Sequence, residues 1–124
     1  QDKILNGFSE IKNITDYKNL SIPKLVFNNL GELMYMSRSP IPGNKKNRLI
    51  RAWKQVCIYS FPRKTLLQFS ATKNKSSLEK IEDIEILRFL EMGFKVKMIK
   101  LSSNSFAIDT KLDLSKLKKR LKKR

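Results

Sequence analysis

The chain of 124 residues has no histidine and a single cysteine, Cys57. The lack of histidine excludes imidazole acid–base catalysis and histidine metal ligands. One cysteine forms neither an internal disulfide nor a cysteine-based zinc site, and an unpaired cysteine fits a reducing compartment. The four glycines are isolated from one another, which excludes a glycine-rich phosphate-binding loop. No apolar run is long enough to cross a membrane, and the first residues do not resemble a signal peptide.

Acidic residues are also scarce, at 11 against 27 lysines and arginines, which gives a net charge of +16. Residues 116–124 hold seven cations and no acid, so the rest of the chain carries +9. Lysine supplies 20 of the 27 cations, and lysine suits bidentate base recognition less well than arginine. This charge leaves open an RNA- or polyanion-binding module. Cations at a helix C-terminus are also favourable through the helix dipole.

Apolar residues make up 40% of the chain and aromatic residues 9%, a globular composition. The length suffices for one domain with a hydrophobic core. The chain starts at Gln1 without a methionine and enters a strand-like stretch within a few residues. We therefore expect a fragment or a processed chain.

Alternating apolar residues predict strands over residues 4–11 and 94–101, and a run rich in β-branched and aromatic residues with an apolar centre predicts a strand over 53–61. Residues 24–36 predict a hairpin, whose turn lies at 28–32. With the helices described next, the order of elements predicts a mixed α/β domain.

Three helices are predicted. Pro62 would begin a short helix that ends near Ser70. Residues 76–92 predict one long helix with a capping box at its start and Gly93 at its end. The apolar stripe of this helix would consist of Leu78, Ile81, Ile84, Leu87 and Leu90. Residues 110–124 predict a closing basic helix.

Four ordered segments resemble a known enzyme family. They are Tyr35–Pro42 (YMSRSPIP), Lys54–Phe61 (KQVCIYSF), Ser77–Arg88 (SLEKIEDIEILR) and Phe106–Thr110 (FAIDT). Together they resemble the C-terminal half of the 3-deoxy-manno-octulosonate cytidylyltransferases, or CMP-Kdo synthetases, within the wider acylneuraminate cytidylyltransferase group. The resemblance implies the C-terminal half of a Rossmann-like, nucleotide-diphospho-sugar-transferase-like mixed-sheet domain. Residues 1–124 would be its sugar-acid-binding and dimerisation half, without the nucleotide-binding N-terminal half.

The resemblance also implies an activity for the full-length enzyme. It would transfer CMP from CTP to a 3-deoxy-2-ulosonic acid such as Kdo and release pyrophosphate, in lipopolysaccharide or surface-polysaccharide synthesis. The expected enzyme is a cytoplasmic homodimer that uses Mg²⁺, with no specific nucleic-acid partner and no membrane partner. Residues 1–124 alone would be inactive, because the family's nucleotide-binding loop and first metal-binding aspartate are missing from them.

The resemblance assigns roles to nine residues. Those expected to contact the sugar acid are Ser37, Arg38, Ser39, Gln55, Tyr59, Glu79, Lys80 and Glu82, and the expected Mg²⁺ ligand is Asp109. An arginine fork suits a carboxylate, and Mg²⁺ takes a few carboxylates together with phosphate oxygens and waters.

Simpler roles remain open for several of these residues. Arg38 could be a surface arginine in a turn, and Tyr59 a buried strand tyrosine. Glu79 could complete the capping box that Ser76 begins. Asp109 could be the N-cap of the last helix, a position that Thr110 could equally fill.

Three positions depart from the family pattern. Gln55 stands where the family usually has histidine, Lys80 where it has glutamine, and Cys57 where it has glycine. Glutamine exchanges hydrogen bonds with hydroxyl groups but does not titrate. These changes keep a nonulosonate or an amino-Kdo open as the substrate. We expect Cys57 to be a small buried side chain.

Overall fold

The computed structural model describes residues 3–102, 108 and 110–123, and within them it has five strands and five helices. The strands are β1 (Ile4–Glu10), β2 (Lys24–Phe27), β3 (Leu33–Ser37), β4 (Trp53–Ser60) and β5 (Val96–Lys100). The helices are α1 (Ile14–Lys18), α2 (Arg63–Ala71), α3 (Ser77–Glu82), α4 (Ile86–Glu91) and α5 (Lys111–Lys122). The mixed α/β prediction is confirmed.

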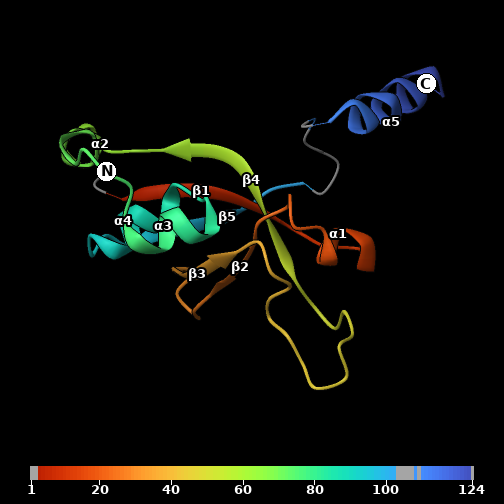
Figure 1. Cartoon of the computed structure of the whole chain (residues 1–124), viewed down its shortest axis with the longest axis horizontal. Coiled ribbons are helices and arrows are strands. Elements are labelled where there is room, and N and C mark those ends of the chain that lie inside the picture. The colour runs from red at the N-terminus through yellow and green to blue at the C-terminus, as the bar shows by residue number, and fades with distance from the viewer. Residues whose placement is uncertain (1–2, 103–107, 109, 124) are drawn as a thin grey trace.

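The strands form one mixed sheet in the order β3-β2-β4-β1-β5. β1 pairs with β5 in parallel and with β4 antiparallel, while β2 pairs antiparallel with both β3 and β4. β2 and β3 form the hairpin that the sequence predicts. Figure 1 shows α3 and α4 lying over β1 and β5. The connection from β1 to its parallel partner β5 therefore passes through helices that cover a sheet face, as parallel pairing requires.

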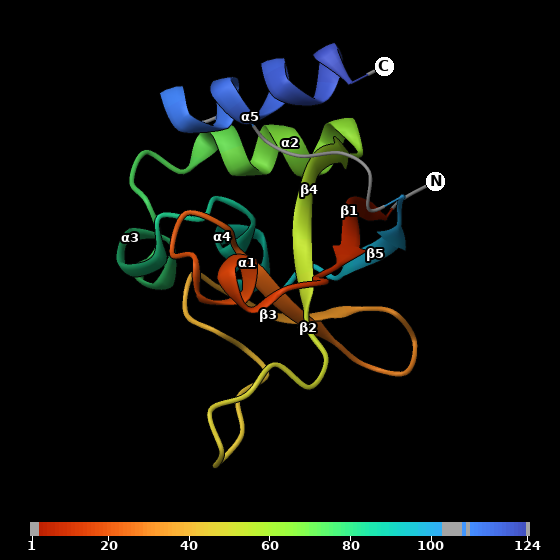
Figure 2. The ribbon, with the colours of Figure 1, turned by 90° about the vertical axis from the view of Figure 1, so that its right-hand side faces the viewer.

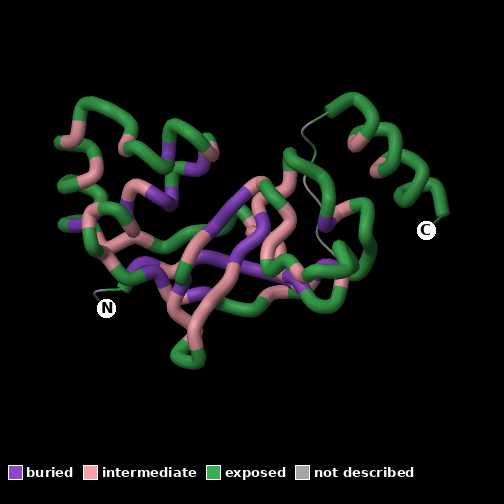
Figure 3. The backbone as a smooth tube through the Cα atoms, turned by 60° about the horizontal axis from the view of Figure 1, so that its bottom comes forward, coloured by how far each residue is buried: buried purple, intermediate pink, exposed green. Residues whose placement is uncertain are grey.

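The hydrophobic core lies between this sheet face and α4. Buried residues lie mainly along the strands and on parts of the helices (Figure 3). The principal core residues are Ile4, Phe8, Leu25, Met36, Ile84, Ile86, Leu87, Phe89, Val96 and Met98. A smaller cluster of Ile11, Tyr17 and Ala52 anchors the long loop before β4. There the Tyr17 hydroxyl donates to the Pro42 carbonyl at 2.7 Å.

The prediction of one continuous helix over residues 76–92 is wrong. The helix breaks at Asp83, which adopts a left-handed backbone with φ of 54°. Ile84 and Ile86 are both buried. On one continuous helix, residues two positions apart point in directions that differ by about 200°, so these two side chains would not share a face. The break lets both face the sheet. Ile81, which the predicted stripe would bury, is 75% exposed instead.

The two outer helices are close to their predicted positions. α2 ends at Ala71, and Pro62 is its N-cap rather than its first helical residue. Thr110 is the N-cap of α5, and no residue of α5 is buried. α5 overlaps α2 in Figure 2, but Figure 1 shows the two helices at opposite ends of the molecule. Within the described residues, no helix combines the length and apolar character needed to cross a membrane.

Candidate functional site

The strand β4 carries a bulge that brings two predicted site residues together. Asn6 of β1 pairs with Tyr59, while the next residue, Gly7, pairs with Val56. One step along β1 therefore matches three steps along β4. Residues four apart on a regular strand are separated by about 13 Å. Here the Gln55 Nε2 atom donates to the Tyr59 hydroxyl at 2.6 Å, because the bulge contracts the strand between them.

Asn6 supports this pair from beneath. Its side chain is 1% exposed, and its Nδ2 atom donates to the carbonyls of Val56 and Ile58 at 3.1 and 3.0 Å. Gln55 Nε2 also donates to Asn6 Oδ1 at 3.2 Å. The result is a connected set of three polar side chains at the edge of the core.

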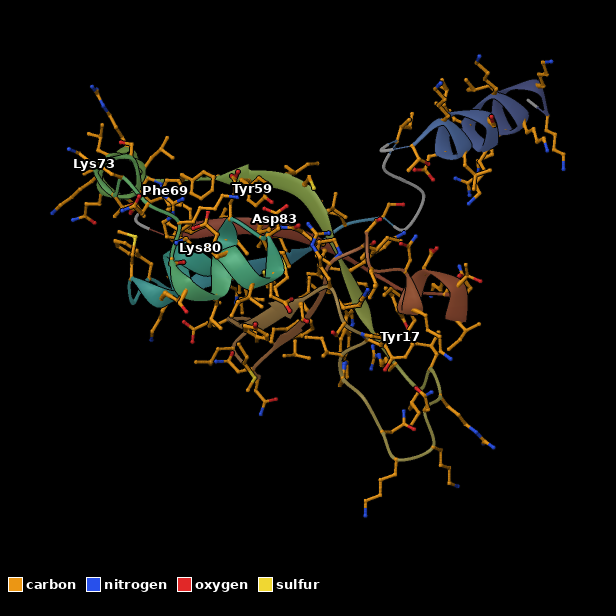
Figure 4. The ribbon with its side chains drawn as sticks, in the orientation of Figure 1. Tyr17, Tyr59, Phe69, Lys73, Lys80 and Asp83 are labelled. Atoms are coloured by element: carbon orange, nitrogen blue, oxygen red, sulfur yellow. The ribbon has the colours of Figure 1, made fainter. Side chains whose placement is uncertain are left out.

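Aromatic rings continue from this pair toward α2 and α4. The Tyr59 ring stacks on Phe61 at 5.5 Å between centroids, Phe61 on Phe89 at 4.9 Å, and Phe89 on Phe69 at 4.4 Å. Figure 4 shows Tyr59 and Phe69 near one another where β4 reaches α2. A pocket of about 120 Å³ opens here, lined by Tyr59, Phe61, Leu66, Phe69, Glu85, Ile86 and Phe89.

The surroundings of Tyr59 keep its hydroxyl protonated. Burial raises the pKa of this phenol to about 12, and the neighbouring Cys57 and Glu85 act in the same direction. At neutral pH Tyr59 is thus a neutral group that can both donate and accept a hydrogen bond. The pair of Gln55 and Tyr59 therefore offers neutral polar groups beside an aromatic surface, an arrangement that suits a polyhydroxylated ligand.

Ser37, Arg38 and Glu82 form a second cluster, where β3 ends beside α3. The Glu82 carboxylate accepts from the Ser37 hydroxyl at 3.0 Å and from the Arg38 amide at 2.8 Å. The Arg38 guanidinium donates to the carbonyls of Glu82, Asp83 and Leu20 at 2.6, 2.8 and 3.2 Å. The first two carbonyls lie at the C-terminus of α3, where a cation is favourable. In this arrangement Arg38 clamps the break between α3 and α4.

Glu79 points away from that cluster and into the core. Its side chain is 1% exposed, and the Arg88 Nε and Nη2 atoms donate to its two oxygens at 2.6 and 2.8 Å. The Ser76 amide donates to Glu79 at 3.0 Å, as the predicted capping box requires. The hydrogen bonds from Arg88 hold the pKa of Glu79 below its usual range, against the opposing effect of burial. Glu79 and Glu82 therefore contact different partners.

The other predicted site residues lie at the surface or outside the residues that the structure describes. Ser39 and Lys80 are exposed, and Lys80 lies on α3 (Figure 4). The expectation that Cys57 is buried is wrong: the bulge turns it outward and it is exposed. Asp109 lies outside the described residues. Among the residues that the structure does describe, no three His, Cys, Asp or Glu side chains gather as a metal site would require.

Sequence reasoning missed two residues that organise the site. Asn6 interrupts the apolar alternation of Ile4 and Phe8, and a polar residue at a core position of a strand is a detectable signal. Arg88 was part of a recognised motif, but nothing in the sequence shows that the chain turns back and brings it onto Glu79.

A solved structure supplies the first comparison. The chain matches a structure of CMP:2-keto-3-deoxy-manno-octonic acid synthetase complexed with CTP, with a TM-score of 0.84 and 25% identity, over 98% of this chain and 50% of that one. Its mixed sheet is therefore half of the fold of a sugar-acid nucleotidyltransferase.

Curated relatives identify the group more closely. The chain is 33% identical over 94% of its length to the 3-deoxy-manno-octulosonate cytidylyltransferase of Geotalea daltonii, and 38% identical over 91% to that of Thermodesulfovibrio yellowstonii. An 8-amino-3,8-dideoxy-manno-octulosonate cytidylyltransferase of Shewanella baltica is 35% identical over 93%. No family model matches the chain.

These matches confirm the resemblance that the four motifs indicate. The chain is homologous to the CMP-Kdo synthetase family of cytidylyltransferases. It spans about half the length of the curated relatives it matches, from 46% to 50% for the three above.

Proposed function

We propose that this chain is the C-terminal, sugar-acid-binding and dimerisation half of a cytidylyltransferase. Completed by a nucleotide-binding half, it transfers CMP from CTP to a 3-deoxy-2-ulosonic acid such as Kdo and releases pyrophosphate. One observation carries this proposal: almost the whole chain superposes on half of a synthetase that was solved with CTP bound.

The chemistry that we propose needs no protein nucleophile. The anomeric hydroxyl of the sugar acid attacks the α-phosphorus of CTP in line, and catalysis depends on positioning and on charge neutralisation. This agrees with the lack of histidine in the chain. Mg²⁺, when bound, would neutralise phosphate charge. As the family resemblance implies, Asp109 would supply one ligand of this ion and the other half of the enzyme the rest.

The proposed sugar-acid surface keeps the eight predicted residues in two groups. Gln55 and Tyr59 would contact the sugar hydroxyls through their side chains, and we propose the same for the exposed Ser39 and Lys80. The remaining four, which are held by bonds within the chain, would act by fixing the walls of the site: Ser37, Arg38, Glu79 and Glu82.

The setting of the complete enzyme belongs to the same proposal. We infer a cytoplasmic homodimer that supplies an activated sugar acid for lipopolysaccharide or other surface polysaccharides. The second half of β4 is exposed from Cys57 to Ser60, and an exposed strand with a 62% exposed Ile58 is the kind of surface that a partner covers.

A second substrate has an observation in its favour. A Shewanella baltica relative acts, by its name, on an 8-amino-3,8-dideoxy-manno-octulosonate, and its identity to this chain, 35%, is within the range of the Kdo-named relatives. Gln55 and Lys80, which depart from the usual family pattern, would set the preference. The amino sugar therefore belongs in the same assay as Kdo.

The test is a pyrophosphate-release assay on a chimera. The N-terminal half of the Geotalea daltonii enzyme is joined to this chain, and CTP is supplied with Kdo, amino-Kdo or a sialic acid. We expect turnover with one of the two octulosonic acids and none from residues 1–124 alone. Gln55→Leu and Tyr59→Phe should each raise the KM for the sugar about tenfold, the effect of one lost hydrogen bond of about 1.4 kcal/mol. Gln68→Leu, an exposed glutamine on α2, is the matched control.

Two results would contradict the proposal. Pyrophosphate release by residues 1–124 without the added half would show that the chain is not an incomplete enzyme. A chimera that folds and binds CTP but turns over none of the sugar acids would remove the assigned activity.

A further inference from the structure

Asn6 occupies a position where a core residue is expected. Alternate residues of a strand share one face, and its neighbours on that face, Ile4 and Phe8, both belong to the hydrophobic core. A buried amide is costly unless its hydrogen bonds are made. In the described structure, the side-chain hydrogen bonds of Asn6 all go to β4: two to backbone carbonyls and one to Gln55. A position that would otherwise hold a core apolar residue is therefore occupied by an amide that shapes β4.

The two hydrogens of the Asn6 amide are both used on the bulge. They meet the carbonyls of Val56 and Ile58, which lie on either side of the outward-facing Cys57. Because Nδ2 is fixed by these two acceptors, the Oδ1 atom of Asn6 can only face Gln55. An acceptor at that point requires the Gln55 side chain to present its amino group.

This requirement fixes the orientation of Gln55. Its Nε2 hydrogens are directed to Asn6 Oδ1 and to the Tyr59 hydroxyl, so the Oε1 atom lies on the other side of the amide as an acceptor. The Tyr59 oxygen, which accepts from Gln55, keeps its own hydrogen, which lies within reach of the neighbouring Cys57 side chain as well as of a ligand. Gln55 therefore presents its Oε1 atom as an acceptor in a fixed orientation, and the Tyr59 hydroxyl presents a donor close to it.

We propose that Asn6 is a positioning residue of the sugar-acid site, which holds the β4 bulge and locks the Gln55 amide so that Gln55 and Tyr59 recognise neighbouring hydroxyl groups of the sugar. This inference rests on the proposed function. Burial raises the pKa of Tyr59 to about 12, so the donor half of the pair is present throughout the neutral range. Asn6 itself needs no contact with the ligand.

A double-mutant cycle on the full 124-residue chain tests the inference. Binding of 3-deoxy-manno-octulosonate is followed by NMR shifts of the side-chain amides, for the wild type, Asn6→Leu, Gln55→Leu and the double variant. We expect about tenfold weaker binding in each single variant. The double variant should bind no more weakly than Gln55→Leu alone, because Asn6 acts through Gln55. Asn6→Ser, which changes the core volume differently, repeats the measurement if Asn6→Leu does not fold.

The same spectra carry a readout that does not depend on the sugar. In the wild type the two Gln55 Nε2 protons should be distinct and slow to exchange with solvent, and in Asn6→Leu they should exchange fast. Ser9→Ala is the matched control, since Ser9 is a buried β1 residue whose hydroxyl has no hydrogen-bond partner in the described structure. It should change neither the Gln55 signals nor the affinity.

The outcomes separate the two proposals. Wild-type binding that Asn6→Leu leaves unchanged, or effects of Asn6 and Gln55 that simply add, would overturn the positioning role and leave the proposed function standing. A second pattern would count against the proposed function instead. In it, exchange of the Gln55 Nε2 protons is faster in Asn6→Leu, but the sugar acid shifts no signal of the wild type.

Discussion

Glu79 and Arg88 form the most completely buried ion pair among the described residues. The two side chains are 1% and 12% exposed, and Arg88 also donates to the Thr72 hydroxyl and lies 4.0 Å over the Phe69 ring. The pair ties α3 to α4 and to the end of α2. Removing one member of such a pair leaves an uncompensated buried charge, which costs more than the pair itself contributes.

We predict that Glu79→Gln lowers the free energy of unfolding by about 3 kcal/mol. The glutamine has nearly the same shape, but it removes the charge that Arg88 faces and one of its two acceptors. Urea unfolding at pH 7 measures the change. Glu85→Gln, at an exposed glutamate on the same segment, should stay within about 0.5 kcal/mol. An equal decrease in the free energy of unfolding in both variants would show that the Glu79–Arg88 pair contributes no more to stability than an exposed glutamate does.

The same pair predicts a dependence on pH. The pKa of Glu79 is lowered in the folded chain, chiefly by the Arg88 hydrogen bonds, so the unfolded chain takes up the proton first as the pH falls. The stabilisation is therefore complete above the unfolded pKa of about 4.3 and is lost as the pH falls through the folded value. The difference in unfolding free energy between wild type and Glu79→Gln should be constant from pH 7 to about 5 and shrink below that. A difference that grows in acid would contradict this sign.

At the scale of the elements, α4 depends on a glycine to stop. Gly93 has φ of +89°, and a Cβ placed there would meet nothing within 4 Å. Its amide donates to the Leu90 carbonyl at 3.0 Å, as at many helix ends. The cost of any side chain at this position is therefore one of backbone conformation alone.

We predict that Gly93→Ala destabilises the chain by about 1 kcal/mol, the cost of a left-handed residue with a Cβ. Gly43→Ala is the matched control, because Gly43 has no positive φ and its nearest neighbour to a new Cβ is the Pro40 carbonyl at 3.8 Å. It should stay within about 0.5 kcal/mol. Thermal or urea unfolding of both variants compares them directly. A harmless Gly93→Ala would show that α4 can end without this turn.

The elements also show what a sequence can and cannot predict. Strand alternation and the Gly93 stop are local patterns, and both were predicted correctly. The break at Asp83 was missed because helical spacing at 78, 81 and 84 fits a continuous helix, and only packing against the sheet makes Ile84 and Ile86 face the same way. The burial of Cys57 was predicted wrongly for a similar reason, since the β4 bulge depends on Asn6, some fifty residues earlier in the chain.

The site follows the same rule. Gln55 and Tyr59 could be nominated from their motif, and the structure brings them into contact. Glu79 and Glu82 could be nominated too, but their positions in the sequence do not show that the two carboxylates have different partners. Their actual partners, Arg88 and the end of β3, come from the turn between α3 and α4 and from the β2–β3 hairpin. Long-range contacts decide which way a correctly chosen carboxylate points.

On the scale of the whole molecule, the C-terminal helix α5 carries much of the positive charge but takes no part in the hydrophobic core. α5 buries no residue, and three of its leucines are among the large exposed apolar side chains. In Figure 1 it stands apart from the sheet. Residues 116–124 nevertheless carry seven of the 27 cations. A terminal segment of this kind adds charge to the molecule without adding to its core.

This separation allows the polyanion-binding alternative to be tested cleanly. Because no residue of α5 is buried, deleting residues 116–124 should leave the free energy of unfolding within about 0.5 kcal/mol while lowering the net charge from +16 to +9. If the chain is part of a cytidylyltransferase, its binding to a single-stranded oligonucleotide should be weak at physiological salt, with a Kd of about 10 μM or higher. That binding should depend steeply on salt and be insensitive to base sequence.

Fluorescence anisotropy at several salt concentrations measures this for the intact chain, the truncated chain and a Lys45→Ala/Lys46→Ala variant, whose exposed loop cations serve as the control. If weak binding reflects total charge, removing any cations lowers the logarithm of the binding constant roughly in proportion to their number, because each phosphate contact releases its own counterions. A nucleic-acid-binding tail would behave differently. Binding would be much tighter, would survive the loop substitutions and would disappear with residues 116–124, and the basic helix would then have a function of its own.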